Sequence, residues 1–415
     1  MTLSQAARQV GWRTPLVVII CGSIIAMVSF GPRSSLGFFL TPMSAANGWG
    51  RDVFAFAVAI QNLLWGLGQP FAGAVADRFG TNRVLMVGAL LYASGLALMA
   101  HSDSPGMLSL SAGVLIGFGL SGCSFNIVLG AFGKLLPESW RSMAFGIGTA
   151  AGSFGQFLFS PFAVALMGPF GWQVALYVFA CILLVIIPLA IALATPPQAA
   201  LTATPGTPAQ APLSLKLALA EAFGHRSYVL LVLGFFTCGF QLAFITVHLP
   251  AYLIDRGLSA EIGGYTLGII GLFNIVGSLM SGWLGNKMPR RYILSFIYFG
   301  RALAVVAFIS LPASPVATLI FGAVTGFFWL STVPPTSSLV AVMFGTRWLA
   351  MLFGFAFFSH QVGGFLGVWL GGLVFEYSGS YNPVWWLSVL FGVLSALINL
   401  PIVEKPAPRL AAAAA

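Results

Sequence analysis

One ionised side chain, Arg33, lies within the otherwise apolar stretch SFGPRSSLGFFL at residues 29–40. An arginine in the hydrocarbon of a bilayer costs at least about 2.5 kcal/mol, so a charge there is expected to have a use. A guanidinium can hold a carboxylate through two parallel N–H bonds, which suits a small planar anion. We therefore expect Arg33 to bind a substrate carboxylate. The alternatives are that it reaches the membrane surface or pairs within the protein.

A second arginine, Arg301, lies in the apolar stretch IYFGRALAV, about 15 Å beyond Arg291 if the stretch is helical. It is either a second positive group of the substrate site or one half of an internal structural pair. All nine acidic residues fall at segment ends or in loops, so none is placed to carry a proton in mid-membrane. His248 and His360 are the mid-segment groups that titrate near neutral pH, and proton coupling would use one of them or the substrate itself.

Polar and aromatic residues within the apolar segments complete the candidate site. The uncharged ones could equally be hydrogen bonds between helices, worth about 0.6 kcal/mol each on average, and Trp329 could equally be a packing residue. The candidate substrate-binding residues are Arg33, Gln61, Asn126, Gln241, Asn274, Arg301, Trp329, His360 and Gln361.

The elements that must position these residues are membrane helices. The chain of 415 residues is 59% hydrophobic and 7% charged, whereas soluble proteins carry about 25% charged residues. Twelve apolar segments are long enough to span a bilayer. They cover residues 15–40, 52–76, 84–101, 107–133, 142–168, 172–194, 228–254, 260–285, 292–312, 315–344, 348–375 and 382–403.

The net charge of +9 is distributed as in a membrane protein rather than a nucleic-acid-binding one. If the N-terminus is cytoplasmic, nearly all Lys and Arg residues outside the apolar segments fall on the cytoplasmic side. Only Arg51 and Arg256 fall on the other side. This bias predicts that both termini are cytoplasmic and leaves no basic patch for nucleic acid.

A stretch rich in Pro, Ala and Thr, TPPQAALTATPGTPAQAPL, separates the sixth and seventh segments and predicts a disordered cytoplasmic linker. The two halves resemble each other, as in GAVADR (73–78) and GWLGNK (282–287). Parallel six-helix repeats are typical of transporters, which bind substrate between the halves. We predict an N-terminal bundle at 1–195, a linker at 196–226, a C-terminal bundle at 227–405 and a tail at 406–415.

The sequence GAVADRFGTNR connects the second and third segments. It contains Gly73, Asp77, Arg78, Gly80 and Arg83. Asp77 places a carboxylate at a helix end, where Arg78 and Arg83 can pair with it. Gly73 permits close approach of another helix, and Gly80 permits a tight turn. The spacing matches the signature GxxxDRxGxxR, and on this motif the chain resembles the major facilitator superfamily. The resemblance implies a conformational latch. Its second copy carries Asn286 in place of the aspartate, so we expect an asymmetric latch.

Residues 30–85, with FGPRSSLGFFLTPM and GWGRDVFAFAVAIQNLLWG, resemble the monocarboxylate transporter and oxalate–formate exchanger group. In monocarboxylate transporters a first-helix lysine pairs with the substrate carboxylate, and the resemblance puts Arg33 at that place. The eighth segment departs from the group, because Asn274 and Ser278 stand where those transporters carry charges. His360 lies in the eleventh segment, where the oxalate exchanger carries a substrate-facing lysine.

These features predict an all-α membrane protein with twelve transmembrane helices in two six-helix bundles. We expect a secondary active transporter of small monocarboxylates or related organic acid anions, working by alternating access with proton symport. The alternatives are an organic anion exchanger, a drug/proton antiporter and a transporter-like receptor.

The remaining expectations concern chemistry and setting. No nucleophilic triad, paired carboxylates, metal-ligand spacing or phosphate loop occurs in the sequence, so we expect neither an enzyme nor a cofactor or metal. The expected setting is the inner (plasma) membrane. The expected partners are the lipid bilayer, a small carboxylate and a proton or counter-anion, and the expected assembly is a monomer.

Overall fold

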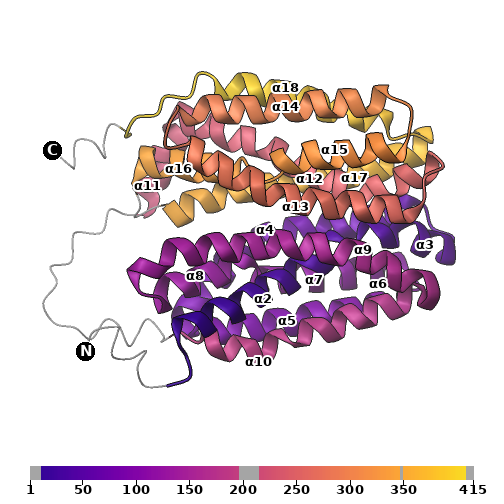
Figure 1. Cartoon of the computed structure of the whole chain (residues 1–415), viewed down its shortest axis with the longest axis horizontal. Helices are drawn as coiled ribbons and strands as arrows, with labels where there is room; N and C mark the ends of the chain where they lie inside the picture. Colours follow the sequence, from indigo (N-terminus) through magenta and orange to yellow (C-terminus); the bar gives the residue numbers. More distant parts are fainter. Residues whose placement is uncertain (1–10, 196–214, 346–348, 408–415) are drawn as a thin grey trace, which may run out of the picture. The chain divides into compact units, whose positions relative to one another are not determined.

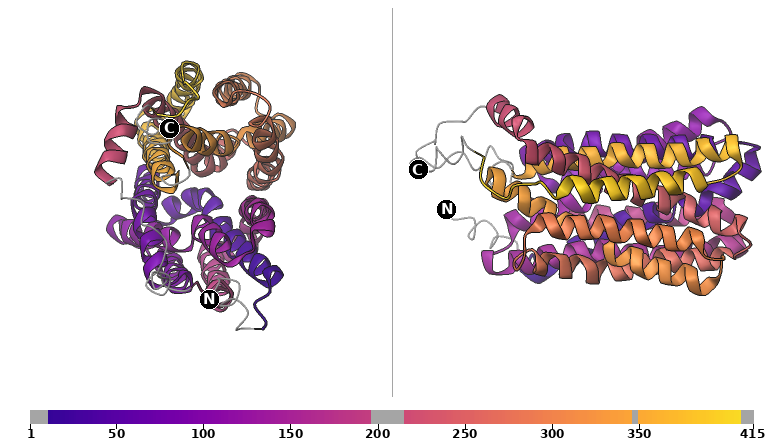
Figure 2. Two further views of the ribbon diagram at one scale, coloured as in Figure 1. Left: turned by 90° about the vertical axis from the view of Figure 1, so that its left-hand side faces the viewer. Right: turned by 90° about the horizontal axis from the view of Figure 1, so that it is seen from above.

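The computed structural model describes residues 11–195, 215–345 and 349–407. This part of the chain contains helices and no strand, which confirms the predicted all-α fold. The chain divides into two compact units, Met1–Pro205 and Gly206–Ala415. Within each unit the longer helices run roughly along one direction (Figure 1), and the end-on view shows them gathered into a bundle (Figure 2).

The N-terminal unit begins with a capped helix. The Thr14 hydroxyl accepts a hydrogen bond from the Val17 N–H at 3.4 Å, and Pro15 occupies the first helical position, where its missing N–H costs nothing. The helices of this unit are α2 (Pro15–Ser34), α3 (Gly37–Asn47), α4 (Arg51–Phe79), α5 (Thr81–Met99), α6 (Pro105–Leu108), the π-helix η2 (Ser109–Leu115), α7 (Ile116–Cys123), α8 (Phe125–Leu135), α9 (Glu138–Leu184), α10 (Ile186–Ala190) and the 3₁₀-helix η3 (Ile191–Leu193).

The C-terminal unit contains one interrupted span, in which α15 stops at Phe328 and α16 resumes at Val333. The helices of this unit are α11 (Leu215–Gly224), α12 (Arg226–Asp255), α13 (Ala260–Leu284), α14 (Arg290–Ser310), α15 (Pro315–Phe328), α16 (Val333–Phe344), α17 (Leu349–Ser378) and α18 (Asn382–Asn399).

The helix α11 lies within residues 196–226, the segment predicted to link the two bundles, and follows the Pro-rich stretch. Its sequence LKLALAEAFG is rich in strong helix formers, which explains why it is helical. Residues 196–214, which contain the prolines of that stretch, lie outside the described residues.

Helices cover the twelve apolar segments predicted from the sequence. Ten helical stretches of the described residues are long and apolar enough to cross a membrane. The fifth and sixth predicted segments share α9, in which Gly171 has a non-helical backbone at φ 79°, a conformation that glycine adopts at little cost. The helix α4 covers the second predicted segment and is not one of the ten. The protein is therefore a multi-pass membrane protein, while the count of twelve crossings stays a prediction.

Small residues let helices approach closely in both units. A Cβ added to Gly155 of α9 would lie 2.3 Å from the Met27 carbonyl oxygen of α2. In the C-terminal unit a Cβ on Gly367 of α17 would lie 2.4 Å from the Phe240 carbonyl oxygen of α12. These contacts hold the helices that carry the candidate site residues.

Candidate functional site

Arg33 lies in the last turn of α2, directly after Pro32, and is 8% exposed. Its Nη2 donates a hydrogen bond to Oδ1 of Asn62 on α4. The Asn62 amide nitrogen in turn donates to the Val58 carbonyl at 2.8 Å, which keeps Oδ1 turned toward the guanidinium. The guanidinium carbon lies 5.0 Å from the ring centre of Trp65, one helical turn further along α4. One helix thus supplies both the acceptor and the aromatic face that hold Arg33.

The Arg33 guanidinium retains unused hydrogen-bonding capacity. Its Nε–H is buried and has no hydrogen-bond partner. Among the side chains that the structure describes, no acidic residue forms an ion pair with Arg33. A buried charge with an open N–H and no counter-charge is an arrangement that an anion would complete.

Tyr92 is the residue near Arg33 that the sequence interpretation missed. It lies on α5, is fully buried, and its hydroxyl has no hydrogen-bond partner of good geometry. The hydroxyl is close enough to Arg33 for the two groups to interact electrostatically. The only signal in the sequence was a single tyrosine in the apolar stretch GALLYASGLAL. The site in the N-terminal unit therefore combines Arg33, Asn62, Trp65 and Tyr92.

Two other residues predicted for this unit lie elsewhere. Gln61 is buried, and its amide nitrogen donates to the Ala112 carbonyl of η2 at 2.7 Å, so that nitrogen joins two helices. Asn126 lies in the first turn of α8 and is partly buried. Within the described chain, Arg33 is hydrogen-bonded to Asn62 and not to either of these residues.

Arg301 lies on α14 in the C-terminal unit and is 2% exposed. Its Nε and Nη2 both donate to the Phe328 carbonyl, at 3.0 and 2.6 Å, and Nη2 also donates to the Trp329 carbonyl. Its Nη1 lies 3.5 Å from Oε1 of Gln241 on α12. The predicted residues Arg301, Gln241 and Trp329 are therefore brought together, and the protein's own carbonyls occupy the donor edge of the guanidinium.

Asn274 joins the same region from α13. Its Oδ1 accepts hydrogen bonds from the Leu330 N–H at 2.9 Å and from the Ser278 hydroxyl at 3.1 Å. Two turns beyond Asn274 on α13, the Ser281 hydroxyl donates to the Ser331 carbonyl at 2.5 Å. The polar side chains of α13 thus bond to the backbone at the interruption between α15 and α16.

The two candidate proton carriers have different surroundings. His248 is buried, its Nε2–H donates to the Val368 carbonyl of α17 at 2.8 Å, and its ring contacts Phe244 and Tyr381. His360 is partly exposed and stacks on Phe357 with ring centres 5.7 Å apart.

The Nδ1 of His360 lies 3.1 Å from Oε1 of Gln361. The Gln361 amide nitrogen is buried and has no hydrogen-bond partner. The partial exposure of His360 makes it the better placed of the two histidines to exchange a proton.

The predicted latch lies at the junction of α4 and α5. Gly80 ends α4 with φ 96°, which a side chain would strain, and α5 follows at once. Arg78 and Arg83 are exposed, and the guanidinium of Arg78 lies over the Phe79 ring at 5.3 Å. The side chain of Asp77 lies outside the described part, so its pairing stays a prediction. No other part of the described chain comes within 4 Å of a Cβ built on Gly73.

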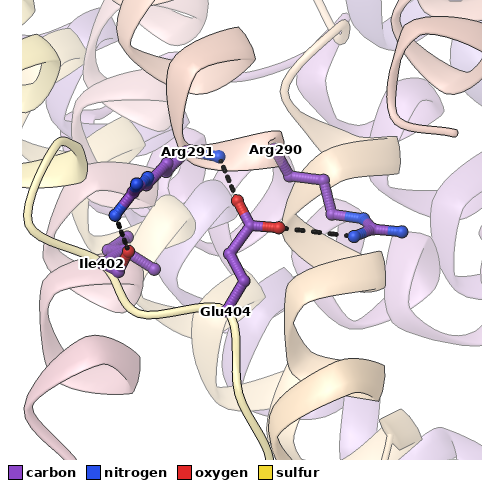
Figure 3. Close-up of polar contacts among 4 residues, drawn as sticks. All are labelled: Arg290, Arg291, Ile402 and Glu404. Carbon is purple, nitrogen blue, oxygen red and sulfur yellow. Dashed lines mark hydrogen bonds and ion pairs between the residues drawn. The ribbon is translucent and has the colours of Figure 1, made fainter. Parts of the chain in front are cut away.

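The matching end of the C-terminal unit obtains its carboxylate from another segment. Glu404, beyond α18, accepts hydrogen bonds from the Arg291 N–H at 2.9 Å and from Arg290 Nη1 at 3.3 Å (Figure 3). The Arg291 side chain donates to the Ile402 carbonyl at 3.2 Å. This cluster lies a few residues after Asn286, where the second copy of the motif lacks its aspartate.

The fold of long apolar helices with buried cations is that of a polytopic membrane protein. The family model of the Major Facilitator Superfamily matches residues 22–368, and the chain belongs to that family. This confirms the resemblance inferred from the motif. The protein is a transporter and not an enzyme.

Relatives match along most of the chain. The uncharacterized MFS-type transporter YcxA of Bacillus subtilis (strain 168) is 29% identical over 92% of this chain and 93% of the relative. Monocarboxylate transporter 13 of Bos taurus is 26% identical over 94% of this chain and 89% of the relative. Among solved structures, the D-xylose-proton symporter matches with a TM-score of 0.70 at 19% identity, covering 95% of this chain and 98% of that chain. The last likeness shows the fold alone.

Proposed function

We propose that the protein is a secondary active carrier of small monocarboxylates in the inner (plasma) membrane, and that Arg33 binds the substrate carboxylate. The observation that carries this proposal is the unused Nε–H of a buried arginine without an acidic partner among the described side chains. The similarity to monocarboxylate transporter 13 supports the same substrate class.

The contacts of Arg33 suit a carboxylate. Nη2 is already bonded to Asn62, and the guanidinium lies over Trp65, so the side chain is held before substrate arrives. A carboxylate approaching the open edge accepts a charge-assisted hydrogen bond from Nε and neutralises the buried charge. The hydroxyl of Tyr92 supplies a further donor from α5. Preorganised donors of this kind lower the cost of ordering the site on binding.

We further propose that transport is proton-coupled symport and that His360 carries the proton, because it is partly exposed whereas His248 is buried and packed. The test is the pH dependence of uptake by His360→Ala between pH 5.5 and 8, the range in which histidines commonly titrate. Symport through His360 predicts a flattened profile, with His248→Ala as the matched control that keeps it. A profile unchanged in His360→Ala would exclude His360 as the proton carrier.

Uptake of labelled monocarboxylates into proteoliposomes tests the role of Arg33. Arg33→Gln should reduce uptake at least about a hundredfold, because it removes the charge that pairs with the anion. Arg256→Gln makes the same charge change at an exposed arginine and should leave uptake unchanged. Thermal unfolding of both variants checks folding. Normal uptake by a folded Arg33→Gln protein would remove Arg33 from the site.

A further inference from the structure

The interruption between α15 and α16 leaves backbone carbonyls that need hydrogen-bond donors or a cation. At Phe328 the helix stops within a stretch that is otherwise apolar enough to span the membrane, and the chain resumes helix at Val333. The last carbonyls of a helix have no partner within it and carry partial negative charge. Such carbonyls in a membrane must be satisfied by the protein or by a bound cation.

Arg301, on the neighbouring helix α14, supplies hydrogen-bond donors to these carbonyls. Three of its hydrogen bonds go to the carbonyls of Phe328 and Trp329. The edge formed by Nε and Nη2, which a carboxylate would use for two parallel bonds, is directed to the Phe328 carbonyl. Among the described side chains, no acidic residue pairs with Arg301. Its charge is therefore balanced by the negative end of α15.

Other side chains surround the rest of the Arg301 guanidinium. Nη1 lies 3.5 Å from Gln241 Oε1, Nη2 lies 3.5 Å from Cys238 Sγ, and the guanidinium carbon lies 5.6 Å from the Tyr298 ring centre. Gln241 is itself fixed by donating to the Ser388 carbonyl at 3.0 Å. The cation is thus held by α12, α14 and the end of α15 together.

We propose that Arg301 is a tethered cation that occupies the carbonyl site of the interrupted helix α15–α16, and that it is a positioning residue rather than a substrate ligand. Unwound helix segments in other transporter folds place their carbonyls on free cations. Here the guanidinium takes that place and fixes the interruption, together with Asn274 and Ser281 of α13. The buried Trp329 is held at the interruption by the same bonds.

The proposal predicts chemical rescue. Arg301→Ala should lower the Tm of the purified protein by about 10 °C, because it leaves buried carbonyls without donors. Millimolar guanidinium should restore most of that loss, while urea at the same concentration should not. Arg291→Ala is the matched control on the same helix, since within the described chain its side chain donates to the Ile402 carbonyl and the Tyr292 hydroxyl and not to the interruption. Its Tm should change little and should not respond to guanidinium.

If Arg301→Ala does not fold, two further measurements still test the proposal: the Tm of the lysine and methionine variants, and the labelling of Cys238. Arg301→Lys retains a cation and Arg301→Met does not, so the lysine variant should have the higher Tm. Maleimide labelling of buried Cys238, read by mass spectrometry, should increase at least about tenfold in Arg301→Met, because the loosened interruption admits the reagent. Equal or reversed stability of the lysine and methionine variants would overturn the proposal, as would a folded Arg301→Ala protein whose Tm ignores guanidinium.

Transport kinetics separate this role from substrate binding, and this one measurement rests on the proposed function. Arg301→Lys should lower the maximal rate of monocarboxylate uptake at least about fivefold while changing KM less than about twofold. A large rise in KM at an unchanged maximal rate would make Arg301 a substrate ligand and overturn the proposal. The stability and labelling measurements need no substrate, so they stand even if the carried anion proves to belong to another class.

Discussion

The two buried arginines of this transporter look alike in the sequence and differ in the structure. Arg33 has an open Nε–H, a single hydrogen bond to an amide side chain, and an aromatic ring beneath it. Arg301 directs its donors to two backbone carbonyls, with Gln241 and Cys238 beside it. A buried charge must be compensated, and the difference lies in what compensates it. For Arg301 the protein supplies the compensation, whereas Arg33 leaves a place for a ligand.

The same substitution at both arginines gives the sharpest test of this contrast. Arg33→Lys keeps a charge but loses the planar fork, so KM for the monocarboxylate should rise about tenfold with little change in Tm. Arg301→Lys should do the reverse, with a lower Tm and nearly constant KM. Uptake kinetics and thermal unfolding of the two purified variants measure both quantities. A shared effect on KM would place both arginines on the substrate.

Removing the acceptor that orients Arg33 should have a smaller effect. Asn62→Ala leaves Nη2 without its partner and frees the guanidinium to change rotamer, so KM should rise about fivefold. Gln61→Ala, at the neighbouring position on α4, removes a bond to η2 instead. It should lower the Tm by a few degrees, about 1 kcal/mol of stability, without raising KM. The reverse pattern would contradict the assignment of the two amides.

Tyr92→Phe tests the residue that the sequence did not reveal. Loss of one neutral donor should raise KM about threefold. The substrate-free protein should keep or gain stability, by up to about 1 kcal/mol, because a buried hydroxyl without a good partner is removed. Uptake and thermal unfolding give the two numbers. A lower Tm with unchanged KM would make Tyr92 a structural residue.

The smallest effect is expected at the Glu404 cluster, which makes no hydrogen bond to either buried arginine among the described residues. Glu404→Gln weakens the hydrogen bonds to Arg290 and Arg291, which are only partly buried. It should cost about 0.5–1 kcal/mol, and the loss should shrink at high salt. Thermal unfolding at two salt concentrations measures it, with Asp103→Asn, at an exposed carboxylate, as a control. A change in KM would connect this cluster to substrate binding.

Much of the fold could be predicted from composition and local signals. Apolar segments and Gly80 after a helix act over a few residues, and the helices and the turn expected from them are present in the structure. The helix α11 was not among the expected segments, although its Ala- and Leu-rich sequence has high local helix propensity.

The candidate site was less predictable because its contacts join distant parts of the chain. Arg33 and Asn62 are 29 residues apart, and Arg301 and Trp329 are 28 apart. Gln61 and Asn126 are amide side chains in apolar segments, like Asn62, yet Gln61 bonds to the backbone of η2 and Asn126 lies in the first turn of α8. From the sequence alone, a polar residue that binds substrate cannot be distinguished from one that joins two helices, because its hydrogen-bond partner is not known.

The sequence alone determined that this chain is a membrane transporter of the Major Facilitator Superfamily, and that Arg33 and Arg301 are charges buried in apolar segments. Hydropathy, motif spacing and the cost of a charge in hydrocarbon are properties of short stretches, so they can be read without a fold. The tertiary structure alone decided which guanidinium is saturated. The Phe328 and Trp329 carbonyls can accept hydrogen bonds from Arg301 because α15 stops beside α14. The sequence around Arg301 does not indicate where α15 ends.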